Sequence, residues 1–369
     1  MLSTDEVLIL TNIPKDSAPG KSLLNELSGR FGIPLRRLIH SAESLKNLKL
    51  IDYDERSEIR VMKLTGIGEI LYRIIEEGWS LPDFSLVPTN SGLKPLGAVV
   101  KEVKKNILQM VAEAGSGHVG ASFSAVEILC TLYFLKMKKD PKNPNWVGRD
   151  CLILSKGHAA PALYAVLSMI GYFPEEEFSK LRELGSILQG HPDLRTPGVD
   201  FVSGSLGQGL SVSIGFALAA KIEGSKRRIY VILGDGELDE GQVWEAALTA
   251  SHLKLDNITA IIDRNRYQLS GETEKIKGLE PLADKWRAFG WEVFEAEGNS
   301  IKSISEALEL SSLVEGKPSL IIAETTKGKG VSFIEGNFFT SRAPTNDELA
   351  KAIAELSYRM DAYDQSIPD

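Results

Sequence analysis

Two apolar segments flank an amphipathic one near the middle of the chain. Residues 229–233 (IYVIL) and 258–263 (ITAIID) are runs of strand length, as expected for strands buried on both faces of a parallel sheet. Between them, apolar residues recur every three or four positions from residue 242 to 253, which predicts a helix with one buried face. A strand, a helix and a strand at this spacing predict a right-handed crossover between parallel strands. The apolar positions of the helix are Val243, Ala246, Ala247, Ala250 and Leu253.

Similar patterns on either side of this unit predict a larger α/β domain. Residues 99–111 have the spacing of an amphipathic helix that leads into the stretch GSGH at residues 115–118. Residues 281–300 predict a helix and a strand, and residues 319–330 predict another buried strand with a glycine-rich loop. The end of that loop, KGKG, is predicted to be a solvated turn. The predicted fold class is therefore α/β, with helices on both faces of a parallel sheet.

Residues 1–80 have a different pattern and predict a separate small α+β domain. Residues 22–31 and 34–50 have helical spacing, SEIRVMKLTGIG alternates like a strand, and LYRIIEEG is again helical. Helix, turn, helix and hairpin is the winged-helix order, and LKNLKLIDYDERSEIRVMKLTGIG resembles part of MarR-like winged-helix domains. Residues 81–93, rich in Pro, Ser and Gly, are predicted to be a linker, which leaves residues 94–369 as the main domain.

The charges of the small domain leave two roles open. Between residues 30 and 49 there are six basic side chains, counting one histidine, and a single acid, Glu43, which suits contacts with phosphates. The predicted wing is acidic, with Asp52, Asp54, Glu55 and Glu58. The domain could therefore bind DNA, or it could be a structural or protein-docking module.

The composition of the chain is that of an ordinary globular protein. The net charge of -8 over 369 residues argues against wholesale binding of nucleic acid or acidic membranes. The two cysteines, Cys130 and Cys151, form no CxxC motif, so neither a disulfide framework nor a cysteine zinc site is expected. Without a long apolar run or a basic region at its start, the sequence predicts no membrane span and no secretory signal, and cytoplasmic localisation is the default.

Acidic side chains gather where the first central strand ends. Asp235, Glu237, Asp239 and Glu240 lie within six positions, and unit charges about 4 Å apart repel by roughly 4 kcal/mol per pair near a protein surface. A divalent cation held by Asp235, the amide oxygen of Asn265 and a backbone carbonyl would relieve this repulsion. A diphosphate could complete the site, because the turn offers free N–H groups and a positive helix end. The alternative is an acidic, solvated loop.

Three of the five histidines, His118, His158 and His191, each follow a glycine. Imidazoles next to small residues suit polar recognition and proton transfer near neutral pH. Taken singly, each could equally be a structural residue.

The segment GDGELDEGQVWEAALTASHLKLDNITAIIDRN resembles the thiamine diphosphate signature, and specifically that of transketolase. GSGHVGASFSAVEIL, RDCLILSKGHAAPALYAVL, LQGHPDLRTPGV and GSLGQGLSVSIGFALAAK resemble further transketolase motifs in the family's order. The resemblance implies a thiamine diphosphate-binding fold, with Mg²⁺ or Ca²⁺ bound by Asp235, Asn265 and the carbonyl of Tyr267. It places Gly236 and Asn265 against the diphosphate, and Glu240 at a subunit interface through which it communicates.

The resemblance also implies roles for the residues of the other motifs. His118 and His191 would contact sugar hydroxyls, and His158 would contact the cofactor. Gly204, Ser205 and Leu206 would line the thiamine diphosphate. The sequence departs from the family at residues 336–344 (GNFFTSRAP), where many transketolases carry a histidine and this chain has none. Arg342 could supply a charge there, but the departure puts substrate preference and full activity in question.

The resemblance covers residues 94–358 and corresponds to the diphosphate-binding half of a transketolase. In that family a glutamate on a second domain activates the cofactor, and the chain ends before such a domain. A split transketolase is therefore implied, completed by a separate C-terminal subunit in a dimer of heterodimers. It would transfer a two-carbon ketol unit from a ketose, as its phosphate, to an aldose. The alternative is a winged-helix regulator that senses thiamine diphosphate or a sugar phosphate without turnover. The sugars, the metal and the stoichiometry stay open.

Overall fold

The computed structural model describes residues 18–19, 51–53, 61–64, 86–269, 271–336 and 342–364. The chain divides into two compact units, Met1–Leu86 and Val87–Asp369. In the first unit, three short strands form an antiparallel sheet in the order β1-β3-β2. The helices predicted at residues 22–31 and 34–50 lie outside the described residues, so the winged-helix domain stays a prediction. The strands are β1 (Ala18–Pro19), β2 (Ile51–Tyr53) and β3 (Val61–Leu64).

A small hairpin occupies part of the stretch predicted to be a linker. Strands β4 (Leu86–Thr89) and β5 (Gly92–Pro95) are neighbours in a two-stranded sheet. Gly92 has φ of +116°, a value that side chains rarely adopt. Glycine, proline and serine are as typical of a tight turn as of a linker, and composition alone does not separate the two.

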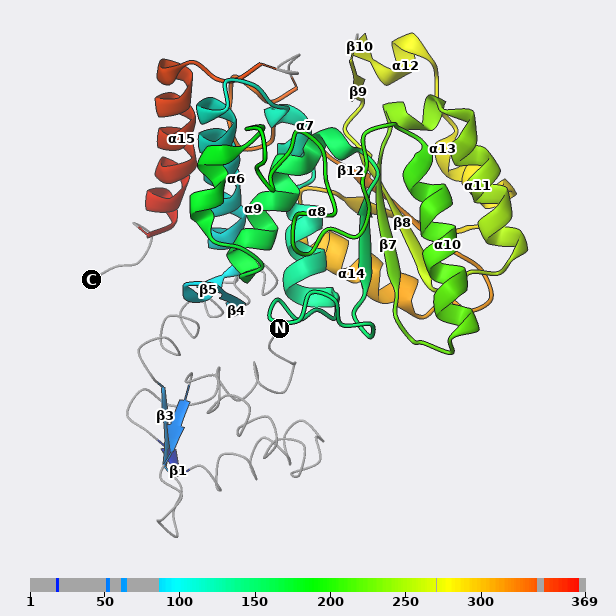
Figure 1. The fold of residues 1–369 in the computed structure, drawn as a ribbon. Coiled ribbons are helices and arrows are strands. Elements are labelled where there is room, and N and C mark those ends of the chain that lie inside the picture. Colours follow the sequence, from blue (N-terminus) through cyan, green and yellow to red (C-terminus); the bar gives the residue numbers. More distant parts are fainter. Residues whose placement is uncertain are drawn as a thin grey trace. The chain divides into compact units, whose positions relative to one another are not determined.

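Five parallel strands form the central sheet of the second unit, in the order β11-β12-β8-β7-β6 (Figure 1). Side chains of β7 alternate between two cores: Ile229, Val231 and Leu233 face one, and Tyr230 and Ile232 face the other. Because both faces are buried, the strands read as continuous apolar runs in the sequence. The strands are β6 (Cys151–Leu154), β7 (Ile229–Gly234), β8 (Ile258–Arg264), β11 (Glu292–Glu297) and β12 (Ser319–Glu324).

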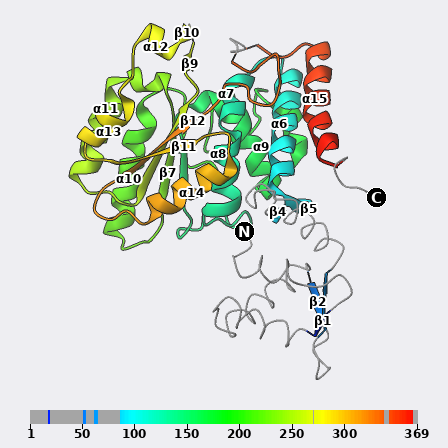
Figure 2. The same ribbon diagram turned by 180° about the vertical axis from the view of Figure 1, so that it is seen from behind.

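Helices cover both faces of this sheet, as Figures 1 and 2 show from opposite sides. One face packs against α10 (Gln208–Ile222), α11 (Gly241–His252) and α13 (Leu282–Ala288). The other face packs against a larger group, which also holds α15 (Asn346–Asp364) through its contact with α6. This group comprises α6 (Leu96–Glu113), α7 (Val119–Ser124), α8 (Val126–Thr131), α9 (Ala160–Ile170) and α14 (Ile301–Ser312).

Shorter elements connect these helices and strands. A hairpin and a single helical turn follow β8, and they are β9 (Tyr267–Gln268), β10 (Gly271–Glu272) and α12 (Thr273–Ile276). The remaining helical turns are η1 (Leu132–Lys136), η2 (Gly157–Ala159), η3 (Glu175–Lys180) and η4 (Gly236–Asp239).

The crossover predicted from the sequence is confirmed. Strands β7 and β8 pair in parallel, with Gly234 opposite Asp263, and α11 connects them. Four of the five apolar helix positions are buried, but Leu253 is 39% exposed, so its predicted burial is wrong. Leu253 caps the end of α11, where the helical periodicity no longer fixes the direction of a side chain.

The two cysteines are free and lie in different cores of the second unit. Cys130 faces the core that contains α6 to α9, and Cys151 faces the core that contains α10, α11 and α13. Burial raises the pKa of the Cys151 thiol to about 12 and also raises the pKa of Cys130. Among the helices in the described part of the chain, none has the length and apolarity needed to cross a membrane.

Candidate active site

A cavity of about 500 Å³ lies where the central strands end. Its wall includes residues that follow four strands: His158 after β6, Asp235 after β7, Asn265 after β8 and Lys327 after β12. Parallel strands bring their carboxyl ends to one edge of a sheet, which is where α/β folds place ligands. The other lining residues are His118, Ala121, Lys156, His191, Gly204, Leu206, Gly234, Gly236, Glu237, Tyr267, Gln268 and Leu269.

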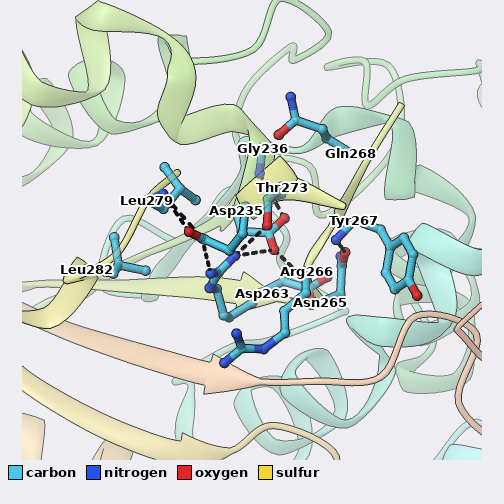
Figure 3. A network of polar contacts seen from close by, with 12 residues as sticks. Asp235, Gly236, Asp263, Asn265, Arg266, Tyr267, Gln268, Thr273, Leu279 and Leu282 are labelled. Atoms are coloured by element: carbon cyan, nitrogen blue, oxygen red, sulfur yellow. Dashed lines mark hydrogen bonds and ion pairs between the residues drawn. The ribbon is translucent and has the colours of Figure 1, made fainter. Parts of the chain in front are cut away.

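Asp235 is held by hydrogen bonds to both of its carboxylate oxygens. Oδ1 accepts from the Gly236 N–H at 2.8 Å, and Oδ2 accepts from the Arg266 N–H at 2.6 Å (Figure 3). The Arg264 guanidinium donates to Oδ2 at 3.1 Å. Burial raises the pKa of Asp235 to about 6, with a further contribution from the Asp263 carboxylate and an opposing one from Arg264. The carboxylate is therefore fixed beside the backbone that carries Asn265 and Tyr267.

Arg266 gives this backbone an unusual conformation. Its φ is +66°, in the left-handed region that residues other than Asn, Asp and Gly seldom occupy. Its N–H points at Asp235, and the Asn265 Oδ1 accepts from the Tyr267 N–H at 3.0 Å. Residues 265–267 thus form a tight turn against the end of β7.

The acidic residues of the GDG segment are compensated largely by the protein itself. Glu237 is buried and accepts hydrogen bonds from the Ser155 hydroxyl, the Gly207 N–H at 2.8 Å and the Gly234 N–H at 2.9 Å. Burial raises the pKa of Glu237, and these hydrogen bonds oppose the rise. Asp239 accepts from Gln268 at 3.2 Å. The repulsion expected from the sequence is therefore relieved in part by Arg264 and by hydrogen bonds, and a cation is not needed to explain all four acids.

The three histidines that follow glycines meet in the same cavity. The rings of His118 and His158 lie edge to face, with their centroids 5.2 Å apart. Burial lowers the pKa of His118 to about 4, with nearby Arg182 contributing, and it lowers the pKa of His158 and His191 as well. At neutral pH the imidazoles are therefore uncharged, and each can both donate and accept a hydrogen bond.

Close packing joins two of the predicted cofactor loops. A Cβ on Gly157 would lie 2.5 Å from the Ser203 Oγ and 3.0 Å from the Ser203 carbonyl carbon. Only glycine therefore allows the loop before His158 to approach Gly204, which lines the cavity together with Leu206. Two predicted residues do not line the cavity: Ser205 and Glu240 are both exposed. Glu240 lies at the start of α11, next to Gly207.

The sequence interpretation missed two lysines of the cavity wall. Lys327 is only 6% exposed and lies 5.7 Å from the centre of the Tyr267 ring, so the prediction of a solvated turn is wrong for this residue. Lys156 is buried and pairs with the Asp263 carboxylate. Burial lowers the pKa of Lys327, and the charge of Lys156 adds to this effect. The only signal for Lys156 was its place directly before the Gly-His pair.

The polar groups of the cavity fit a diphosphate and a hard cation. The donors predicted for the cation are a carboxylate, an amide oxygen and a carbonyl, which are the oxygen ligands that Mg²⁺ and Ca²⁺ prefer. Within the described parts of the chain, no three His, Cys, Asp or Glu residues gather as a metal cluster. Such a cation would need oxygens from a ligand as well. Two buried atoms of the wall, His118 Nδ1 and Gln268 Oε1, have no hydrogen-bond partner among the described residues.

Arg342 does not line this cavity. Its backbone bridges to Ser116, and its guanidinium pairs with Glu348 at the start of α15 at 2.6 Å. Residues 337–341, most of the segment without the expected histidine, lie outside the described residues. The positive charge that Arg342 could have supplied to the site is instead paired with the Glu348 carboxylate.

Comparison with known proteins agrees with this geometry. Residues 97–365 match the model of the family described as transketolase, thiamine diphosphate binding domain. The chain belongs to the transketolase family. It is 48% identical over 256 residues to the 6-deoxy-6-sulfo-D-fructose transketolase subunit of Clostridium sp. (strain MSTE9), covering 69% of this chain and 93% of that protein. It is 46% identical over 272 residues to an apulose-4-phosphate transketolase subunit of Actinobacillus succinogenes, covering 73% and 98% respectively.

Solved transketolases share the fold but are longer. The structure of a variant transketolase from Pichia stipitis superposes with a TM-score of 0.67 at 32% identity, covering 72% of this chain and 40% of that one. The predicted fold class and the predicted likeness to the N-terminal half of a split transketolase are confirmed. These transketolase relatives favour an enzyme, and they give no support to the alternative of a winged-helix regulator.

Proposed function

We propose that this chain is the diphosphate-binding subunit of a two-chain, thiamine diphosphate-dependent transketolase. It transfers a two-carbon ketol unit from a ketose to an aldose. The observation that carries the proposal is the convergence of Asp235, Asn265, Tyr267 and the histidines on one cavity at the carboxyl ends of the strands. Two relatives of which this chain covers 93% and 98% are themselves named transketolase subunits, which supports a second chain that supplies the remainder of the enzyme.

The cofactor's diphosphate is held at the end of β7. Asp235, the Asn265 amide oxygen and the Tyr267 carbonyl bind a divalent cation, Mg²⁺ or Ca²⁺, with diphosphate oxygens completing its coordination. Gly236 begins η4, and its backbone lies at the cavity wall, where a diphosphate can approach it. Lys327 adds positive charge to the same cavity. This charge replaces some of what the missing histidine would have supplied.

The remaining wall residues orient the sugar and the cofactor ring. Thiamine diphosphate, when bound, supplies an electron sink for breaking the carbon–carbon bond beside a carbonyl. His118 and His191 are neutral at pH 7, so they can hold sugar hydroxyls and exchange protons with them. His158, with its ring against His118, and the loop of Gly204, Ser205 and Leu206 position the cofactor.

The second subunit closes the cavity. Loops that line the cavity also carry exposed apolar side chains, which are Leu184, Leu194, Val202 and Leu269. We propose that the C-terminal subunit covers these loops and buries their apolar side chains, and that Glu240, exposed at the start of α11, contacts a neighbouring subunit. Two such pairs would form a dimer of heterodimers.

The relatives point to the class of sugar. Their names assign them 6-deoxy-6-sulfo-D-fructose and apulose 4-phosphate, each of which carries an anionic group at a distance from the ketone. We propose that the donor of this enzyme is likewise a ketose with a phosphate or sulfonate group. The missing histidine bears on which of the two is preferred.

The role of residues 1–80 and the cell compartment of the enzyme are proposed from the sequence. A winged-helix domain there would either bind DNA or dock the enzyme to another protein. A shift in the mobility of DNA that weakens with salt favours the first role, and its absence at low salt favours the second. We place the enzyme in the cytoplasm.

Reconstitution tests the proposed function. The purified chain, its C-terminal partner, thiamine diphosphate and Mg²⁺ are mixed, and ketol transfer is followed with a set of sugar phosphates and sulfo-sugars. We expect negligible transfer without the partner and turnover with it. The variant Asp235→Ala should abolish turnover, whereas Asp284→Ala on the exposed side of α13 should not. Unchanged turnover in Asp235→Ala would contradict the metal assignment, and cofactor binding without any transfer would favour a sensor.

A further inference from the structure

Arg264, the last residue of β8, is a fully buried arginine that the proposed chemistry does not use. Its Nη1 donates to the Asp235 Oδ2 at 3.1 Å and to the Thr273 Oγ1 at 2.7 Å. Its Nη2 donates to the Glu274 Oε1 at 2.6 Å and to the Glu280 Oε1 at 3.0 Å. One guanidinium thus joins three carboxylates, one of which lines the cavity.

The hydrogen bonds leave one oxygen of Asp235 available to a ligand. Oδ2 accepts from both Arg264 and the Arg266 N–H, so both of its lone pairs are used. Oδ1 accepts only from the Gly236 N–H and keeps one lone pair. Without the guanidinium, only the Gly236 and Arg266 N–H groups would hold the carboxylate, and Oδ2 would regain a lone pair that competes with Oδ1 for the ligand.

The charges around Arg264 favour a cation at Asp235. A guanidinium alone beside a metal ligand would repel the metal. Here Glu274 and Glu280 pair with it as well, so Arg264 together with its three carboxylates carries a net negative charge. Asp235 can therefore be oriented by Arg264 without losing its attraction for a cation.

Arg264 also ties the turn at residues 265–267 to the chain that follows. The Glu274 carboxylate accepts from the Leu279 N–H, and Glu280 accepts from the Leu282 N–H at the start of α13. Thr273 donates its N–H to the Arg266 carbonyl at 3.0 Å. The β9–β10 hairpin, which carries the cavity residues Tyr267 and Gln268, is thereby held in place.

We propose that Arg264 is a positioning residue that presents Oδ1 of Asp235 to the divalent cation, and that Glu274 and Glu280 balance its charge so that the cation can bind. The proposal rests on the proposed function, because it presupposes a cation and a diphosphate at Asp235. It predicts a loss of cation affinity when Arg264 is removed, although removing a positive charge should by itself strengthen cation binding.

Cofactor titrations at several fixed Mg²⁺ concentrations test the proposal without depending on turnover. They are made on the complex of both chains, with tryptophan fluorescence as the signal. We expect Arg264→Met to lower the affinity for Mg²⁺ by about 10–100-fold, as is typical when a residue that orients a metal ligand is lost. Arg264→Lys should recover little of this affinity, because one ammonium group cannot reach four acceptors in two directions. Glu280→Gln, at a side chain that is 52% exposed, should weaken Mg²⁺ binding by about twofold to threefold.

Arg287→Met is the matched control. It removes a surface arginine of α13 that pairs with Asp284 and Glu295, and it should leave Mg²⁺ binding unchanged. Tighter or unchanged Mg²⁺ binding in Arg264→Met would overturn the proposal. So would unchanged binding in Glu280→Gln, a mild substitution that keeps the test open if Arg264→Met fails to fold. A wild-type complex that binds no cofactor at all would instead overturn the proposed function.

Discussion

Asp263 and Arg264 are neighbours at the end of β8, and they organise opposite sides of the sheet. On one side the Asp263 carboxylate contacts Lys156, Ser124 and Thr325. On the other side the Arg264 guanidinium contacts Thr273 and the carboxylates of Asp235, Glu274 and Glu280. Both side chains are fully buried, but the partners around these two centres differ in number, in the sign of their charge and in exposure to solvent.

The partners of Asp263 suit a role in stabilising the fold, whereas those of Arg264 also suit a role in binding a ligand. Lys156 and Asp263 have matched charges, are both sealed from solvent, and connect the end of β6 to β8. Arg264 has three acidic partners, two of which reach solvent, with 36% and 52% of the side chain exposed for Glu274 and Glu280. A sealed, balanced pair can mainly hold the structure together. A centre with surplus negative charge at a cavity wall can also serve a bound cation.

The largest expected effect follows from breaking the sealed pair. Lys156→Met leaves Asp263 buried and without its counter-charge, which should lower the free energy of unfolding by about 3–5 kcal/mol. Denaturant titration measures the loss. The double variant Lys156→Met, Asp263→Leu should recover part of it, because no buried charge is then left unpaired. A single variant as stable as the wild type would remove the distinction between the two centres.

A smaller loss of stability is expected on the other side of β8. Arg264→Met should lower the free energy of unfolding by about 2–3 kcal/mol, because Asp235 keeps two N–H donors and the two glutamates can turn toward water. The same denaturant titration applies. The comparison is sharpest when both variants are also titrated with Mg²⁺ and cofactor. A larger loss for Arg264→Met than for Lys156→Met would reverse our interpretation.

The sealed side can also be weakened without removing a charge. Thr325→Val deletes the hydroxyl that donates to the Asp263 Oδ1, and it should lower the free energy of unfolding by about 1.5 kcal/mol. Thr325→Ser keeps the hydroxyl and serves as the matched control, so thermal unfolding should place it near the wild type. Equal losses in the two variants would mean that packing, and not the hydrogen bond, is responsible.

The smallest expected effect concerns pH. Burial gives His118 a pKa of about 4 in the fold, below its ordinary 6.5, so the unfolded chain binds a proton first as the pH falls. The contribution of His118 to stability should therefore be complete above pH 6.5 and decline toward pH 4. Lys156 is one of the charges that lower this pKa, so Lys156→Met should raise it slightly, as NMR titration of the ring can measure. A pKa near 6.5 would contradict the buried, neutral site.

The central crossover could be predicted from the sequence because local pattern decides it, whereas the shared site of the three histidines followed only from the resemblance to a family. A strand buried on both faces must be apolar throughout, and parallel geometry then brings Asp235 and Asn265 to one edge. Lys156, Lys327 and Arg264 could not be placed in the same way. A charged residue is normally exposed, and only distant partners make its burial tolerable. For Arg264 these partners lie 9 to 29 positions away, on both sides along the chain.

The buried thiols of Cys130 and Cys151 make this protein well suited to site-directed labelling. Because they are buried and their raised pKa values leave almost no thiolate at neutral pH, they should not react with maleimide reagents. A single cysteine introduced at exposed Leu194 would then be the only reactive position among the described residues. A fluorophore attached there could report the arrival of the second chain in real time, without any change to the native cysteines.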